Sequence, residues 1–184
     1  MQTRSLPHDL GVAVGASAVL GLFSAFGDWV WARFIPDGAV VPGIVHGVLV
    51  FGILALVLGW AAGTKRATSR LLVTLPFAGL LIAAGFYPLA RWMGYITALV
   101  ASWTAMWVAL AILSRWVAGR RESFRTALLR GLFAASLSGL AFYAISGIWT
   151  HPDPDPNYAL RFVYWTFAFL PGFVSFLWGR ESER

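Results

Sequence analysis

The chain contains no cysteine and few charged residues. Of its 184 residues, 12% are Asp, Glu, Lys or Arg, which is about half the share found in an ordinary soluble domain. The absence of Cys excludes disulfide bonds and thiol chemistry. By contrast, 59% of the residues are hydrophobic and 16% are aromatic. This balance indicates a membrane protein.

Recognisable catalytic and metal-binding motifs are also missing. No His, Asp and Glu residues show the spacing of metal ligands, and no Ser–His–acid set accompanies a nucleophile elbow. No Gly-rich loop is suited to cradle a phosphate. The apolar runs at 71–90 and 95–114 carry no acid or base at depth, which disfavours a proton-coupled pump. We therefore expect no enzyme activity, no metal and no cofactor.

Six apolar runs are long enough to cross a bilayer, which takes about 20 residues in a helix. The connections between them are short, so neighbouring helices should be antiparallel. We predict an all-α integral membrane protein, with residues 1–184 forming a single six-transmembrane-helix bundle. The predicted helices cover residues 10–32, 40–62, 71–90, 95–114, 127–148 and 158–178.

The distribution of positive charge predicts the orientation of this bundle. The second and fourth connections carry Lys65, Arg66 and Arg70, and Arg115, Arg120, Arg121 and Arg125. Because positive loops stay in the cytoplasm, these connections and both termini should be cytoplasmic. The same residues explain the net charge of +6 without nucleic acid as a partner. An Arg-, Ala- and Gly-rich composition suggests a bacterium, and hence its cytoplasmic (inner) membrane.

The fifth connection, in the stretch THPDPDPNYALRF, raises the question of a metal site. His151, Asp153 and Asp155 alternate with three Pro residues. Pro favours the polyproline II conformation, in which alternate side chains point about 240° apart. A hard cation would also need more oxygen ligands than this stretch supplies. We interpret the stretch as a stiff connector, after which Pro156 or Asn157 starts the last helix.

Asp28 and His46 lie within the predicted helices and are candidates for ligand binding. Asp28 is near the outer end of the first helix, and an intramembrane acid is a functional candidate by default. The alternative is that Asp28 pairs with Arg33 or reaches the interface. His46 is about 9 Å inside the second helix. It could bind the polar headgroup of a ligand or a backbone group of the last helix, or it could be a packing residue with a hydrogen bond.

Four aromatic residues complete the predicted ligand-binding set. Trp103 and Trp107 are four residues apart, so they share one face of the fourth helix near the bilayer midplane. Rings at this depth either line a cavity or fill the space between helices, and the sequence leaves both possibilities open. Tyr87 and Tyr143 are the other two members.

Small residues recur every fourth position in three of the helices, as Gly131, Ala135 and Gly139, Gly11 and Gly15, and Gly43 and Gly47. Such spacing lets helix backbones approach closely, and it suggests a homo-oligomer of unspecified subunit number. Pro76 and the pair Pro171–Gly172 are expected to interrupt the third and sixth helices, because Pro removes a backbone hydrogen bond.

Several short stretches resemble the Insig (insulin-induced gene) family of six-span membrane proteins, including its bacterial homologues. The family pattern is an aromatic residue, Thr-x-Pro-Asp, an Arg and an aromatic residue in the last helix, a small-residue pair and a final Gly-Arg. Val-Pro begins the second helix of the family. The matching residues here are Trp149, Thr150, Pro152 and Asp153, Arg161, Tyr164–Trp165, Pro171–Gly172, Gly179–Arg180 and Val41–Pro42. Pro154, Asp155 and Pro156 look like a three-residue insertion.

The resemblance implies a lipid-accessible cavity within the bundle that holds a diacylglycerol-like or sterol-like membrane lipid. Eukaryotic members use an acid between the third and fourth helices to regulate a partner protein, but this chain has Arg91 in that region and no acid. Binding of such a lipid is our leading hypothesis. A small transporter or channel subunit using His46 and Asp28 is the alternative, and a lipid-modifying enzyme using either residue as a base is a third.

Overall fold

The structure is a computed structural model that describes residues 6–34, 39–62, 65–118, 122–146 and 157–178, all but a few of them in six helices. No membrane, ligand or second chain is part of it. The helices are α1 (Leu6–Phe34), α2 (Val40–Ala62), α3 (Lys65–Met93), α4 (Tyr95–Ala118), α5 (Phe124–Ser146) and α6 (Tyr158–Trp178). The predicted six-helix, all-α organisation is therefore confirmed.

The ends of several helices differ from the prediction. Helices α2 and α6 have the predicted bounds, whereas α1 and α3 extend beyond them at both ends. The sequence-based bounds of α3 stopped at the first cations, but Lys65, Arg66, Arg70 and Arg91 all belong to the helix. Apolarity marks where a helix lies in hydrocarbon, whereas backbone hydrogen bonds decide where it ends. Residues with long cationic side chains can therefore belong to helical turns outside the apolar region, because their charged ends reach water.

The expectation that Pro interrupts two helices was wrong. Pro76 and Pro88 both lie inside continuous α3, and Pro171 lies inside continuous α6. A Pro removes one backbone bond, but in a bundle the neighbouring helices and local adjustments satisfy the freed group. The loss of one bond is too small to end a helix that its neighbours hold in place.

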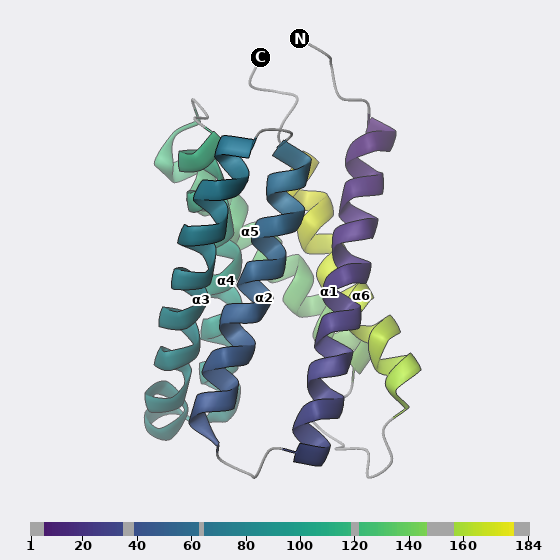
Figure 1. Cartoon of the computed structure of the whole chain (residues 1–184), viewed down its shortest axis with the longest axis vertical. Helices are drawn as coiled ribbons and strands as arrows, with labels where there is room; N and C mark the ends of the chain where they lie inside the picture. The colour runs from purple at the N-terminus through teal and green to yellow at the C-terminus, as the bar shows by residue number, and fades with distance from the viewer. Residues whose placement is uncertain (1–5, 35–38, 63–64, 119–121, 147–156, 179–184) are drawn as a thin grey trace.

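The helices run antiparallel in a ring in which the first and last helices are neighbours (Figure 1). Around the ring the order is α1, α6, α5, α4, α3 and α2, and α1 meets α2 at far fewer positions than it meets α6. Gly94 alone separates α3 from α4 and has a φ of 88°. That conformation favours Gly because a Cβ would clash with the backbone.

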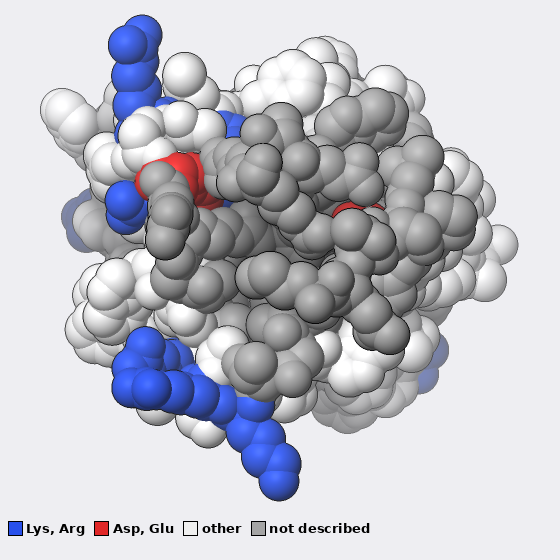
Figure 2. Space-filling model, turned by 90° about the horizontal axis from the view of Figure 1, so that it is seen from above, with Lys and Arg blue, Asp and Glu red and all other residues white. Residues whose placement is uncertain are grey.

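The two ends of the bundle differ in charge. The end where α3 and α5 begin carries Lys65, Arg66, Arg70, Arg115 and Arg125, and we call it the basic end. Helix α1 begins and α6 ends there too (Figure 1). We call the opposite end the distal end. Seen from the basic end, the Lys and Arg side chains form separate groups toward one side of the molecule (Figure 2).

The tightly packed core lies mainly in the half of the bundle nearer the basic end. Its largest fully buried side chains are Trp107, Phe173, Leu20, Leu54, Leu75 and Leu110. In α2 the buried hydrophobic residues begin at Phe51, in α3 they end at Leu75, and in α6 they begin at Ala168. Most described residues closer to the distal end are only half-buried or exposed. The distal half is therefore the less densely packed half.

Five of the six helices, α1 to α5, are long and apolar enough to cross a membrane. Large apolar side chains also cover the outside of the bundle, for example Leu22, Val73 and Leu140. A helix that is hydrophobic all round needs an apolar environment on every side. The chain is therefore a multi-pass membrane protein. Helix α6 is not among the five, and it contains Arg161 and Pro171 within its apolar sequence.

Candidate ligand-binding site

An ion pair joins the first and last helices in the distal half. Arg161 of α6 donates from Nη1 to Oδ2 of Asp28 at 3.2 Å, and Trp165 donates from Nε1 to the same oxygen at 2.9 Å. Arg161 and Trp165 are four residues apart, so both lie on the face of α6 that meets α1. The side chains of Asp28 and Arg161 are 28% and 21% exposed. This is a half-buried, charge-assisted cluster within an apolar bundle.

The partner of Asp28 is not the one considered from the sequence. Arg33 lies instead over the ring of Trp29, with its guanidinium carbon 5.6 Å from the ring centroid. The side chain of Arg33 is exposed at the end of α1, whereas Arg161 comes from a helix packed along α1. Asn157 helps to start α6 by accepting the backbone N–H of Leu160 at 3.1 Å. That cap places Arg161 in the second turn, level with Asp28.

His46 of α2 lies against α1 beside this cluster. Its ring stacks on Phe23 with a centroid distance of 5.4 Å and an interplanar angle of 14°. A Cβ added at Gly27 would lie 2.9 Å from His46 Nδ1, so only Gly at position 27 leaves room for the imidazole. Gly27 directly precedes Asp28. Asp28 therefore lies next to the contact of His46 with α1, while its own hydrogen-bond partners are on α6.

Tyr87 closes the distal side of the same contact. Its hydroxyl donates to the carbonyl of Ala39 at 3.4 Å and lies against Gly43 of α2. A Cβ at Gly43 would also lie 3.2 Å from the ring of Trp31 in α1. Helices α1, α2 and α3 thus meet here, one turn of α2 from His46. Tyr87 therefore lies near His46, and its role in ligand binding stays a prediction.

Trp103 is linked to the ion pair through an aromatic cluster made of Trp103, Phe142, Trp165 and Phe169. The Trp103 centroid is 5.5 Å from that of Phe142, 5.3 Å from Phe169 and 6.2 Å from Trp165. Trp165 in turn donates to Asp28. The Nε1 atom of Trp103 is buried and has no hydrogen-bond acceptor among the described residues.

The two remaining members of the predicted set lie elsewhere. Trp107 is fully buried, meets the edge of Phe173 at a centroid distance of 5.1 Å and lies flush against Gly172. It occupies the packed half, below the aromatic cluster. Tyr143 is 67% exposed on the outside of α5. Neither side chain faces Asp28 and His46.

Sequence reasoning missed three contributors to this site, namely Trp165, Phe23 and Gly27. Trp165 entered the sequence analysis only through the aromatic pair Tyr164–Trp165, although its spacing of four from Arg161 was a usable signal. Phe23 and Gly27 also lie four apart on α1, and their role depends on His46 arriving from another helix. The fifth connection, with His151, Asp153 and Asp155, lies outside the described residues.

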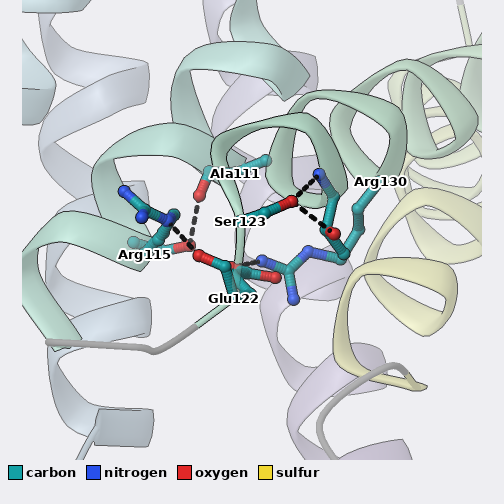
Figure 3. Close-up of polar contacts among 7 residues, drawn as sticks. Ala111, Arg115, Glu122, Ser123 and Arg130 are labelled. Atoms are coloured by element: carbon teal, nitrogen blue, oxygen red, sulfur yellow. Dashed lines mark hydrogen bonds and ion pairs between the residues drawn. The ribbon is translucent and has the colours of Figure 1, made fainter. Parts of the chain in front are cut away.

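A second polar cluster lies at the basic end, between α4 and α5 (Figure 3). The carboxylate of Glu122 pairs with Arg130, and the side chains are 0% and 9% exposed. Arg115 donates from Nε to the backbone carbonyl of Glu122, and Ser123 accepts the backbone N–H of Thr126 at 3.0 Å, which caps α5. This cluster fixes the connection between two helices.

The small-residue stripes have different roles. A Cβ at Gly131 would lie 2.7 Å from Cα of Val108, and one at Gly47 would lie 2.6 Å from Cβ of Ala83, so both positions serve close packing within the chain. Gly11 and Gly15 have nothing within 4 Å of an added Cβ.

The distal site thus combines an ion pair, an imidazole and a tyrosine hydroxyl with the aromatic cluster. It lies in the less densely packed half of an apolar bundle. Comparison with models of protein families, with curated proteins and with solved structures found no match to this chain.

Proposed function

We propose that this protein binds a hydrophobic membrane lipid in the distal half of its helix bundle. The observation that carries the proposal is the position of Asp28, His46 and Arg161 within the less densely packed half of an apolar bundle. Ionisable groups are costly in that environment and usually mark a functional site. In a bundle with a purely structural role, an apolar core without ionisable groups would have a lower free energy.

The chemistry of these residues suits a lipid with a small polar end. Both bonds to Asp28 use Oδ2, so a lipid hydroxyl could donate to Oδ1 while His46 accepts or donates beside it. The hydrocarbon part would lie along Phe23 and the aromatic cluster. A diacylglycerol-like or sterol-like molecule has one hydroxyl on an apolar body. An anionic headgroup would meet repulsion from Asp28 at close range.

The proposed site is smaller than the set predicted from the sequence. It comprises Asp28, His46, Tyr87 and Trp103, with Arg161 and Trp165 holding Asp28 in place. The buried Nε1 of Trp103 would gain an acceptor if a lipid ester or hydroxyl oxygen reached it. Trp107 and Tyr143 are left out because one is enclosed by packing and the other points outward.

The Insig-like assignment, the six-span topology and the cytoplasmic termini belong to the same proposal. Helix α6 would be the sixth span, since pairing with Asp28 lowers the cost of placing Arg161 among apolar residues. The basic end would face the cytoplasm of a bacterium, across its inner membrane. Self-association would use Gly11 and Gly15, the one stripe with open space above it.

Native mass spectrometry of the protein in mild detergent, with lipid extraction from the same sample, tests the binding proposal. Wild-type protein should retain a chemically uniform lipid in stoichiometric amount. His46→Ala should lower its occupancy by about tenfold, since one buried hydrogen bond is lost. Tyr143→Phe is the matched control and should retain lipid like the wild type, because this side chain faces outward.

A heterogeneous lipid background that is easily stripped from folded wild-type protein would count against lipid binding. In that case the transporter alternative gains weight, because His46 lies against the residue that precedes Asp28 and two titratable groups are then adjacent within the membrane. Flux of small solutes in proteoliposomes, lost in His46→Ala, would favour transport. Absence of flux across a broad panel would exclude that alternative.

A further inference from the structure

We propose that the start of α3 is a binding site for the headgroup of an anionic phospholipid of the membrane leaflet at the basic end. Lys65, Arg66 and Arg70 are all exposed, and α3 has no acidic residue in its first turn. We call these three residues the α3 basic patch. Lys and Arg side chains gather in separate groups at this end of the molecule (Figure 2). This site is separate from the distal site and does not depend on its ligand.

The patch is unfavourable for the helix that carries it. Arg66 and Arg70 are four residues apart, and like charges at this spacing repel each other on a helix surface. All three cations lie near the helix N-terminus, where the backbone dipole also disfavours positive charge. The described part of the chain places no carboxylate in an ion pair with any of them. A bound phosphate would relieve both costs at once.

The residues below the patch identify the partner as a lipid. Arg66 and Arg70 share one face of α3 with Val73 and Phe77, at spacings of four, three and four residues. Val73 is 73% exposed and Phe77 is 61% exposed, so the same face continues as an apolar surface toward the distal end. Two cations above an apolar column match a phosphate above its acyl chains. A nucleic acid would gain nothing from the apolar part.

A tryptophan from α2 marks the level of this patch along the bundle axis. Gly59 packs so closely on α3 that an added Cβ would lie 2.7 Å from the side chain of Thr68. Trp60 follows Gly59 directly and is 70% exposed. Residue 60 therefore lies near the height of Thr68, between Arg66 and Arg70 along the axis, on the side of α3 that meets α2. Exposed Trp at this level is typical of the membrane–water interface.

Binding of phosphatidylglycerol and phosphatidylcholine to the full chain, compared by native mass spectrometry from mixed micelles, tests this proposal. Wild-type protein should hold phosphatidylglycerol in preference to phosphatidylcholine, and added salt should weaken the preference. In R66Q/R70Q the affinity for phosphatidylglycerol should fall by roughly thirty-fold, since each cation near an anionic surface contributes about fivefold.

The matched control is R33Q/R91Q, which removes the same charge from two exposed positions at the distal end. It should bind phosphatidylglycerol like the wild type. An R66Q/R70Q protein that binds as tightly as the wild type would overturn the proposal, as would an equal loss in the control. Both variants change exposed side chains, so circular dichroism should show the wild-type helix content.

Discussion

At the scale of single residues, Trp107 shows how a large ring at mid-depth can fill the space between helices. The ring is fully buried, and Gly172 of α6 lies directly against it. Helices α4 and α6 are not neighbours in the ring, so Trp107 bridges the centre of the bundle and the absence of a side chain at 172 makes room for it. The sequence left packing and cavity lining open for this residue, and the contact with Gly172 accounts for it as packing.

We predict that Gly172→Ala lowers the thermal stability of the protein. The added Cβ meets the Trp107 ring at less than contact distance, and overpacking of this kind typically costs about 1–3 kcal/mol. Gly85→Ala is the control, since nothing lies within 4 Å of its added Cβ. It should be neutral or gain up to about 1 kcal/mol from helix propensity. Melting curves in the same detergent give the comparison, and equal midpoints for the two variants would contradict this account of Trp107.

At the scale of elements, the junction of α4 and α5 depends on one buried carboxylate. Glu122 lies in the connection, and its carboxylate pairs with Arg130 of α5. Its backbone carbonyl accepts a hydrogen bond from Arg115 of α4 (Figure 3). In the sequence, Glu122 is only an acid among arginines in the fourth connection. Its complete burial follows from the way α5 folds back on α4, which brings Arg130 over it.

We predict that Glu122→Gln destabilises this junction by up to about 3–5 kcal/mol, because it removes the charged partner from a buried ion pair. Adding Arg130→Met should restore part of the loss, since two neutral groups then share the site. The melting temperatures of both variants, together with the rate of proteolysis between α4 and α5, would report the effect. If Glu122→Gln melts and is cleaved like the wild type, the pair contributes nothing to the junction.

At the scale of the whole molecule, the two ends of the bundle differ in both charge and packing. The basic end carries the α3 basic patch and the Glu122 cluster, and the densest core lies beneath it. The distal end carries the ion pair of Asp28 and Arg161 and is less tightly packed. This asymmetry is what a membrane protein needs if one face anchors it and the other half receives a ligand.

The native chain has no cysteine, so single introduced thiols can report its orientation. Lys65→Cys at the basic end and Trp92→Cys at the distal end both occupy exposed positions. We expect a membrane-impermeant maleimide to label Lys65→Cys only from the cytoplasmic side and Trp92→Cys only from the opposite side. Labelling of both from one side would contradict a membrane-spanning α3, and the reverse pattern would invert the proposed orientation.

Much of the fold could be predicted from local features of the chain. Long apolar runs produce helices because a backbone surrounded by hydrocarbon must satisfy its own hydrogen bonds, and short connections make neighbours antiparallel. The stripe at Gly131 was likewise visible in advance. The bounds of α3 and its continuity through Pro76 were not, since they depend on the surrounding helices as well as on local sequence.

Only some members of the candidate site could be proposed from the sequence, and its contacts could not. The sequence by itself determined that Asp28 and His46 are unusual, because any charge in an apolar run is costly. Only the tertiary structure decided that Asp28 pairs with Arg161, 133 residues away, instead of the nearby Arg33. The physical reason is that the ring closes by packing α1 against α6. Which helices become neighbours is settled by the fit of many side chains at once, and no single stretch of the chain contains that information.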